Sequence, residues 1–230
     1  MVSDSTDVFV ERFGRPVIES PGMHVEDPFF DDVLGRCGPG RVGAGWFLGR
    51  LFYLFGTGLE RLEPCVREWS FLLPDDLERY AILGYNVFGA ILLVDAGTGF
   101  PHSAPVGLLD PLTMTYHQND WMDLAALTTG LADHIFPFVV DPGGVYEAFL
   151  RREERLLDDD EILGIYEPLS IGGQEVLENF TPIDIVEYYR AVGPSYAQAH
   201  EELVGSPSTI HRRVVNVSPS VSAPLTVEST

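Results

Sequence analysis

Apolar residues are grouped into short stretches through the middle of the chain. Four of these stretches have the length and composition of strands and are bounded by turn residues: 82–88, 91–95, 106–109 and 113–117. Two earlier stretches, residues 46–48 and 51–54, predict a buried strand or hairpin. The later stretches are joined by short turns, such as residues 96–99 and 110–111. Short connections join antiparallel strands, so the pattern predicts an antiparallel meander.

Helical periodicity flanks this β-rich region. Before it, residues 27–37 and the apolar stripe at residues 59–69 predict two helices. After it, an acidic or hydroxyl residue ahead of each apolar run predicts four helix starts: Asp120, Asp141, Asp158 and Thr181. Residues 168–171 and 175–177 are strand candidates between the last two helices. Strands grouped in the middle with helices on both sides predict an α+β fold, in which a central, mostly antiparallel sheet is flanked by helices.

The chain is expected to form a single compact unit with two lobes. The N-terminal lobe spans residues 20–118 and the C-terminal lobe spans residues 119–205. Residues 206–230 are rich in Ser, Pro, Thr and Val, have little helical periodicity, and are expected to form a flexible tail. Three valines leave an edge strand in this tail open as the alternative: Val214, Val215 and Val217.

The charge balance is strongly acidic. All 14 basic residues are arginines, and 35 acidic residues give a formal net charge of −21. Residues 1–205 hold 12 of the arginines and 34 of the acids, so the excess, −22, belongs to the expected folded body. A field of this sign repels nucleic acid and anionic membranes and attracts basic partners. We therefore expect a basic protein partner and no direct binding to nucleic acid or membrane, with a solubility or salt-adapted surface as the alternative.

No segment predicts export or membrane insertion. Residues 1–12 carry no basic stretch followed by an apolar run, and residues 90–94, the longest apolar candidate, are far shorter than the roughly 18 residues of a membrane span. The expected location is the cytoplasm. Cys37 and Cys65 lie far apart without a CxxC pair, so we expect two reduced, half-buried thiols and neither a disulfide framework nor a zinc site.

Catalytic motifs are weak throughout the chain. Residues 38–43 fit the G-x-G-x-x-G pattern, but they follow a predicted helix, whereas a dinucleotide-binding loop follows a strand. His117 and Asp120 have a spacing that some hydrolytic and metal sites use, although a helix cap explains Asp120 more simply. We therefore expect a binding protein without catalytic residues, cofactor or metal. A metal-dependent hydrolase that uses His117 and Asp120 is the alternative.

Two runs of acidic residues are candidates for the contact with a basic partner. In order of preference, they are the run Asp158, Asp159, Asp160 and Glu161 and the pair Asp75 and Asp76. The first run lacks the alternating spacing and the glycine of a calcium loop. Charge runs are also common on solvated surfaces, and a helix N-terminus is the simpler interpretation of the first run.

Residues 164–193 combine an aromatic and apolar stretch, an apolar-Gly-Gly turn, an acidic stretch that ends near Asn, and a terminal helix. Seven residues carry this pattern: Ile171, Gly172, Gly173, Glu175, Asn179, Asp184 and Glu187. The pattern resembles the C-terminal signature of the GAD-like immunity proteins, the partners of type VI secreted DNase toxins and related polymorphic toxins. Upstream, residues 34–46, 81–95 and 120–121 are similar to the N-terminal part of the same family, so the resemblance covers residues 25–204.

The resemblance implies a GAD-like lobe over residues 20–118 and an immunity-type lobe over residues 119–205. It also implies a function, that of a bacterial, antitoxin-like immunity protein that neutralises a cognate secreted toxin by occluding its active or substrate-binding surface. The acidic charge agrees with a nuclease as that toxin, because a nuclease must present a basic surface to its substrate. A regulatory or scaffold domain of the same fold, with a partner that is not a toxin, is the alternative.

Overall fold

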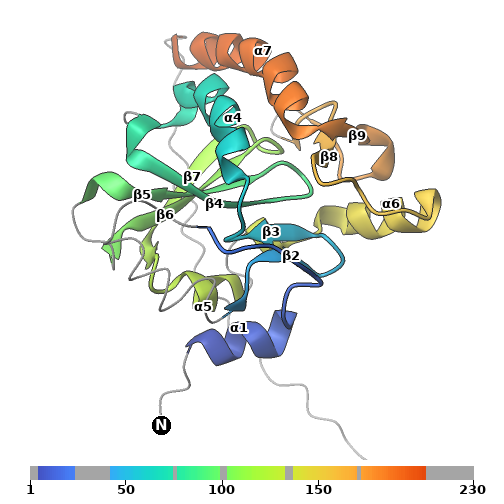
Figure 1. The fold of residues 1–230 in the computed structure, drawn as a ribbon. Helices are drawn as coiled ribbons and strands as arrows, with labels where there is room; N and C mark the ends of the chain where they lie inside the picture. Colours follow the sequence, from blue (N-terminus) through green and yellow to red (C-terminus); the bar gives the residue numbers. More distant parts are fainter. Residues whose placement is uncertain are drawn as a thin grey trace, which may run out of the picture.

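An open seven-stranded sheet forms the centre of the molecule (Figure 1). The structure, a computed structural model, describes these residues: 5–23, 42–74, 77–98, 103–132, 137–169 and 172–205. The strands lie side by side in chain order: β1 (Ile18–Glu19), β2 (Gly45–Phe47), β3 (Phe52–Leu54), β4 (Tyr80–Asn86), β5 (Ile91–Asp95), β6 (Pro105–Asp110) and β7 (Thr115–Asp123). With the helices around it, this sheet gives the predicted α+β fold.

Every neighbouring pair of strands in this sheet is antiparallel, which confirms the predicted hairpin and meander. In the β2–β3 hairpin Trp46 lies opposite Tyr53. The next pairing depends on Gly84, because a Cβ at this position would lie 2.2 Å from the carbonyl oxygen of Tyr53. Strand β5 is buried along its whole length, which explains why its sequence is a continuous apolar run and not an alternating one.

Helices cover the sheet on opposite sides. Five α-helices are described: α1 (Ser5–Phe13), α4 (Glu63–Glu68), α5 (Leu127–Ala132), α6 (Val145–Glu153) and α7 (Ile185–Gly205). Helix α4 packs against α7, whereas α1 packs against α5, and Figure 1 shows the two pairs above and below the sheet. The predicted stripe before α4 and within it is buried, and the ring of Trp69 lies 5.0 Å from that of Tyr189 in α7.

A separate pair of strands, β8 (Glu161–Ile165) and β9 (Phe180–Asp184), corrects the prediction for this part of the chain. No helix starts at Asp158, because the short apolar run that follows it pairs as a strand with β9. Residues 168–169 and 175–177 are not strands. The N–H of Gly173 donates to the carbonyl oxygen of Pro168 at 3.0 Å, and the N–H of Leu169 donates to that of Leu112 at 2.8 Å, so the expected strand pairing does not form. Residues 170–171 lie outside the described chain.

Two other predicted helix starts are displaced by three residues. Asp120 lies inside β7, and Asp123 instead accepts the N–H of Ala126 at 2.8 Å ahead of α5. Thr181 lies inside β9, and Asp184 instead accepts the N–H of Glu187 at 2.9 Å to cap α7. In both cases strand pairing with a neighbour extends past the first capping residue. The start at Asp141 is confirmed, because its carboxylate accepts the N–H groups of residues 146 and 147.

Several predictions lie outside the described residues. They concern the helix over residues 27–37, the glycines up to residue 40, Cys37, the pair Asp75 and Asp76, and the tail after Gly205. The expected lobe boundary between residues 118 and 119 falls inside β7. In the part of the chain that is described, no helix is both long enough and apolar enough to cross a membrane.

Candidate partner-binding surface

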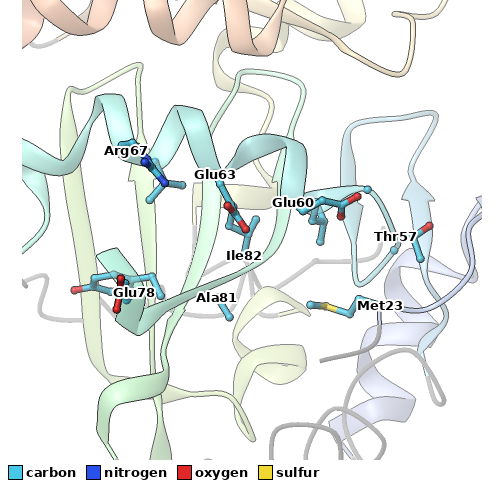
Figure 2. Close-up of a pocket in the computed structure, with 13 residues that line it drawn as sticks. Met23, Thr57, Glu60, Glu63, Arg67, Glu78, Ala81 and Ile82 are labelled. Carbon is cyan, nitrogen blue, oxygen red and sulfur yellow. The ribbon is translucent and has the colours of Figure 1, made fainter. Parts of the chain in front are cut away.

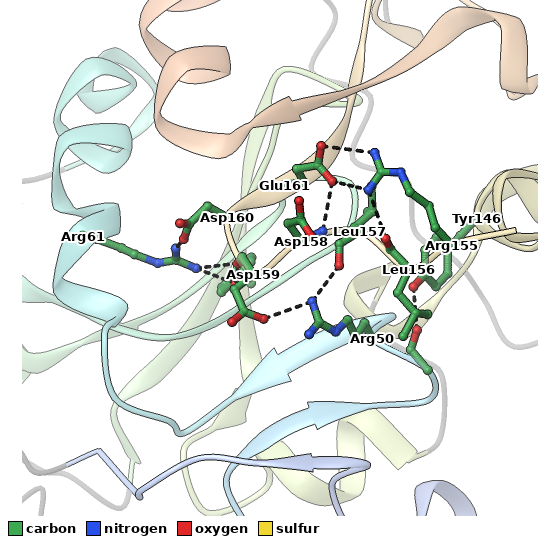
Figure 3. A network of polar contacts seen from close by, with 12 residues as sticks. Arg50, Arg61, Tyr146, Arg155, Leu156, Leu157, Asp158, Asp159, Asp160 and Glu161 are labelled. Carbon is green, nitrogen blue, oxygen red and sulfur yellow. Dashed lines mark hydrogen bonds and ion pairs between the residues drawn. The ribbon is translucent and has the colours of Figure 1, made fainter. Parts of the chain in front are cut away.

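The acidic run at residues 158–161 lies in the loop before β8 and at the first position of that strand, and most of its charge is already paired (Figure 3). Three ion pairs join it to arginines, two from distant segments and one from the same loop: Arg50–Asp159, Arg61–Asp160 and Arg155–Glu161. The Arg50–Asp159 pair spans 3.0 Å and the Arg155–Glu161 pair 2.6 Å. A basic partner would have to displace these arginines to reach three of the four carboxylates, so the run is a poorer docking site than the sequence suggests.

Two of these arginines, Arg50 and Arg61, tie the loop to the seven-stranded sheet and the 3-10 turn beside it. Arg61 donates to the hydroxyl of Tyr85 at 2.7 Å and to the carbonyl oxygen of Asp159 at 2.8 Å, and the Tyr85 hydroxyl donates to that carbonyl at 2.7 Å. Arg50 donates to the carbonyl oxygen of Leu157 at 2.6 Å. Burial raises the pKa of Tyr85, so its hydroxyl stays a donor at neutral pH. These contacts make the acidic run part of the fold.

Glu161 has the clearest electrostatic coupling in this run. The hydrogen bonds from Arg155 hold the pKa of the Glu161 carboxyl below its usual range. The N–H of Asp158 adds a further hydrogen bond to the same carboxylate at 2.9 Å. The ionised form of Glu161 is therefore stabilised by the fold.

A groove of about 690 Å³ lies between the segment before β4, the start of β4, and the helical segment formed by the 3-10 turn Leu59–Leu62 and α4. Its lining combines apolar side chains, such as Val66 and Ile82, with charged ones. Figure 2 shows Glu60 and Glu63 projecting from the helical segment and Glu78 from the chain ahead of β4, with Ile82 and Ala81 nearby.

The charges of this groove differ from those of the acidic run. Glu60, Glu63 and Glu78 are all exposed, and within the described residues none of them forms an ion pair with an arginine. Arg67 is the one basic residue in the described lining. Three carboxylates against one guanidinium leave a local formal charge of −2, with apolar surface between the charged groups. The groove therefore offers free acceptors for cationic side chains and apolar surface for their stems.

Of the candidate catalytic pair, the structure describes the side chain of His117 alone. His117 is exposed on β7, and its Nε2 lies 2.6 Å from the hydroxyl oxygen of Thr115. That hydroxyl lies 2.6 Å from the one of Thr113, which donates to Asp110 at 2.7 Å. Hydroxyl groups thus link His117 to Asp110, while the side chain of Asp120 lies outside the described atoms. In the ranges that the structure describes, no three His, Cys, Asp or Glu side chains are grouped so that they could hold a metal ion.

Cys65 is fully buried in the core, where a half-buried thiol was predicted. Its Sγ donates to the carbonyl oxygen of Ile185 at 3.9 Å. Burial, with a smaller contribution from Asp184, raises the pKa of the Cys65 thiol to about 12. The thiolate, which is the nucleophilic form, is therefore rare at neutral pH.

The residues of the Gly-Gly and Asn pattern shape the loop between β8 and β9. Asn179 accepts the N–H of Glu167 at 3.0 Å and donates to the carbonyl oxygens of Glu167 and Gln174 at 2.9 and 3.2 Å. A Cβ at Gly173 would lie 1.7 Å from the Glu167 carbonyl oxygen, and Gly172 has a φ of +112°. Asp184 and Glu187 form the cap of α7 described above. These contacts within the chain give structural roles to five of the seven residues of the pattern, and Ile171 lies outside the described residues.

Sequence reasoning missed the groove. Glu60 and Glu63 lie on the polar face of the helical stripe that was predicted from Leu59 to Trp69, so this pattern was the available signal. This pattern predicts the helix face on which the carboxylates lie. It does not predict that β4 packs beside this face and so forms the groove.

No family model matches the chain, and no curated protein matches it. Its fold is similar to the crystal structure of Atu4351 from Agrobacterium tumefaciens, with a TM-score of 0.53 and 16% sequence identity. The similarity covers 84% of this chain and 88% of that chain. At this level of identity it establishes a shared fold alone.

Proposed function

We propose that this protein is an immunity factor that binds and neutralises a cognate protein toxin with a basic surface. The observation that carries the proposal is the groove at Glu60, Glu63 and Glu78, where three exposed carboxylates lack ion-pair partners among the described residues. The sequence resemblance to the GAD-like immunity proteins and the strongly acidic composition support the same function.

The groove suits a basic partner for a simple energetic reason. An arginine or lysine side chain can pair with Glu60, Glu63 or Glu78 without displacing an intramolecular partner. At the run of residues 158–161, the same side chain would compete with Arg50, Arg61 and Arg155. Breaking an existing pair offsets the gain of a new one, so binding in the groove has the larger net benefit.

A nuclease is the class of toxin that we favour. Its substrate-binding face must be basic to hold phosphates, and this is the surface that an acidic protein can cover. Long-range attraction between the two surfaces accelerates association, and it weakens as salt is added. Inhibition by this route is stoichiometric, with one molecule occupying one toxin, and it requires no catalytic group.

The test is co-expression with the toxin-like product of a neighbouring gene. The proposed function predicts that growth is rescued and that the two proteins copurify in a complex that weakens at high salt. A complex without growth rescue would indicate a partner that is not a toxin, the scaffold alternative. If neither rescue nor a complex is observed, the immunity function is wrong.

A further inference from the structure

Two aspartates are buried among the described residues, and only one of them has a cationic partner. Asp95 is 4% exposed and accepts hydrogen bonds from Arg79, the shortest of them 2.8 Å from Nη2 to Oδ2. Asp110 is 6% exposed and is bonded to neutral donors, the N–H of Leu112 at 3.0 Å and the hydroxyl of Thr113 at 2.7 Å. A buried carboxylate without a countercharge is costly, and it is satisfied by binding either a proton or a cation.

A cavity of about 200 Å³ adjoins Asp110. It lies where the β4–β5 and β6–β7 turns meet residues 137–142, Leu169 and Glu175. Most of its lining is apolar, including Phe88, Leu108 and Leu112. Val140 and Glu175 also line it and are exposed, so the cavity reaches the surface. A water molecule occupies about 30 Å³ in the liquid, so the cavity has room for about six groups of that size.

Among the polar groups that line the cavity, the Asp110 carboxylate carries the unmatched charge. The Oδ1 of Asn86 accepts the N–H groups of Phe88 and Ala90, and one of the two N–H groups on its Nδ2 donates to the carbonyl oxygen of Phe138. The Thr113 hydroxyl donates to Asp110. A carboxylate has about four lone-pair positions, and two donors occupy only part of them. The open positions of Asp110 therefore favour a ligand that donates hydrogen bonds and carries positive charge.

We propose that this cavity is a binding site for an alkylammonium group, with the apolar walls holding a chain of four or five carbons and Asp110 receiving the ammonium. Such a group has the size of the cavity and the charge that Asp110 lacks. The same chemistry is offered by a free aliphatic amine and by the side chain of a lysine on a protein partner. A planar guanidinium fits less well, because Asp110 uses both oxygens for internal bonds.

The titration of Asp110 is consistent with this site. Burial raises the pKa of the Asp110 carboxyl, which means that the environment disfavours a lone negative charge. The other titratable groups nearest to it are His117 on β7, which reaches it only through Thr115 and Thr113, and Tyr188 and Tyr189 on α7. A bound ammonium would supply the missing charge, so it is expected to lower the pKa of Asp110 and to bind more weakly in acid.

This site is independent of the groove. The groove is lined by the first residues of β4, Tyr80 to Ile82, whereas the cavity is lined by Asn86 at the other end of the same strand. Loss of one site therefore leaves the other in place, and the two proposals can fail separately.

The experiment titrates butylammonium and pentylammonium chloride into the full chain and follows backbone amide chemical shifts at constant ionic strength. The expected result is saturable shifts at residues 86–90 and 108–113, with no saturable effect of butanol or of butyrate. Asp110→Asn keeps an acceptor for Leu112 and a donor for Thr113, and it should weaken amine binding at least tenfold. Glu175→Gln at the mouth serves as the charge control and should change binding by less than threefold.

A second variant keeps the test decisive if Asp110→Asn does not fold. Ala90→Leu adds side-chain volume to the cavity wall and should abolish the shifts while Asp110 stays in place. The absence of saturable shifts in the wild type, or equal binding by Asp110→Asn, would overturn the proposal. Competition between butylammonium and the protein partner would identify the source as a lysine side chain, and saturable amine binding without such competition would identify a free amine.

Discussion

The hydroxyl of Tyr85 donates a 2.7 Å hydrogen bond to the carbonyl oxygen of Asp159, which ties the seven-stranded sheet to the loop ahead of β8. Tyr85→Phe removes this bond, together with the one that the hydroxyl accepts from Arg61, and otherwise keeps the shape of the side chain. We expect it to lower the free energy of unfolding by about 0.5–1.5 kcal/mol, as measured by urea denaturation. Tyr166→Phe is the matched control, since this tyrosine is 68% exposed, and it should have no measurable effect. Equal stability of the Tyr85→Phe variant and the wild type would show that the contact contributes nothing.

The ion pair between Arg155 and Glu161 should make stability depend on pH. The pKa of Glu161 is lowered in the folded state, so its contribution is present above the unfolded value, near 4.5, and is lost as pH falls through the folded value. Because Arg155 is 42% exposed, screening limits this contribution to about 0.2–1 kcal/mol. Glu161→Gln should therefore be less stable than the wild type at pH 7 and approach it below pH 4 in urea titrations. A stability difference that does not change with pH would contradict the coupling.

The stability that Asp110 contributes should depend on pH in the opposite direction to that of Glu161. Its pKa is raised in the folded state, so the folded protein binds more protons than the unfolded chain between the unfolded value, 3.8, and the raised value. Stability contributed by this group therefore rises as pH falls through that interval. The unfolding free energy of the wild type minus that of Asp110→Asn should increase on acidification, as measured by urea titrations at a series of pH values. A difference that decreases on acidification would rule out a raised pKa.

Gly173 is required by a close approach of the backbone. A Cβ would lie 1.7 Å from the carbonyl oxygen of Glu167, and a backbone oxygen cannot move aside as the end of a flexible side chain can. Gly173→Ala should destabilise the protein by more than about 2 kcal/mol in thermal or urea unfolding. Gly193→Ala in α7 is the control, since its nearest contact would be an ordinary 3.4 Å and helix propensity favours Ala by up to about 1 kcal/mol. If both variants unfold alike, the close approach is not what requires Gly173.

The β2–β3 hairpin and the β4–β7 meander could be predicted from the sequence because turn residues mark the boundaries of each short apolar run. The starts of α5 and α7 could not be predicted, because each is preceded by two possible capping residues at the same spacing. Asp120 is followed by Asp123 three residues later, as Thr181 is by Asp184, and either member of each pair could cap a helix. Which one does so depends on how far β7 pairs with β6 and β9 with β8, and this pairing is a tertiary property.

The pairing of the acidic run was also beyond the sequence. Arg50 and Leu157, which bond to each other, are 107 residues apart, and Arg61 and Asp159 are 98 apart. No local sequence pattern links such distant positions. The sequence alone therefore predicts that the carboxylates of residues 158–161 are unpaired. For the carboxylates of the groove the difference is the reverse. The sequence predicts that Glu60 and Glu63 lie on an ordinary solvated helix face, and the structure places β4 beside them to form the groove.

The most direct measurement of the proposed function compares two triple variants with equal changes in charge. The first, Glu60→Gln, Glu63→Gln and Glu78→Gln, neutralises the groove. The control neutralises three exposed acids elsewhere: Glu11→Gln, Glu178→Gln and Glu201→Gln. The dissociation constant of the toxin complex is measured for both by calorimetry at low and at physiological salt.

Neutralising the groove should raise the dissociation constant at least tenfold, which corresponds to about 1.4 kcal/mol, whereas the control should change it less than threefold. The loss should shrink as salt is added, because part of it comes from long-range attraction. Equal effects of the two triple variants would show that binding depends on net charge and not on the groove, and this result would contradict the proposed binding surface.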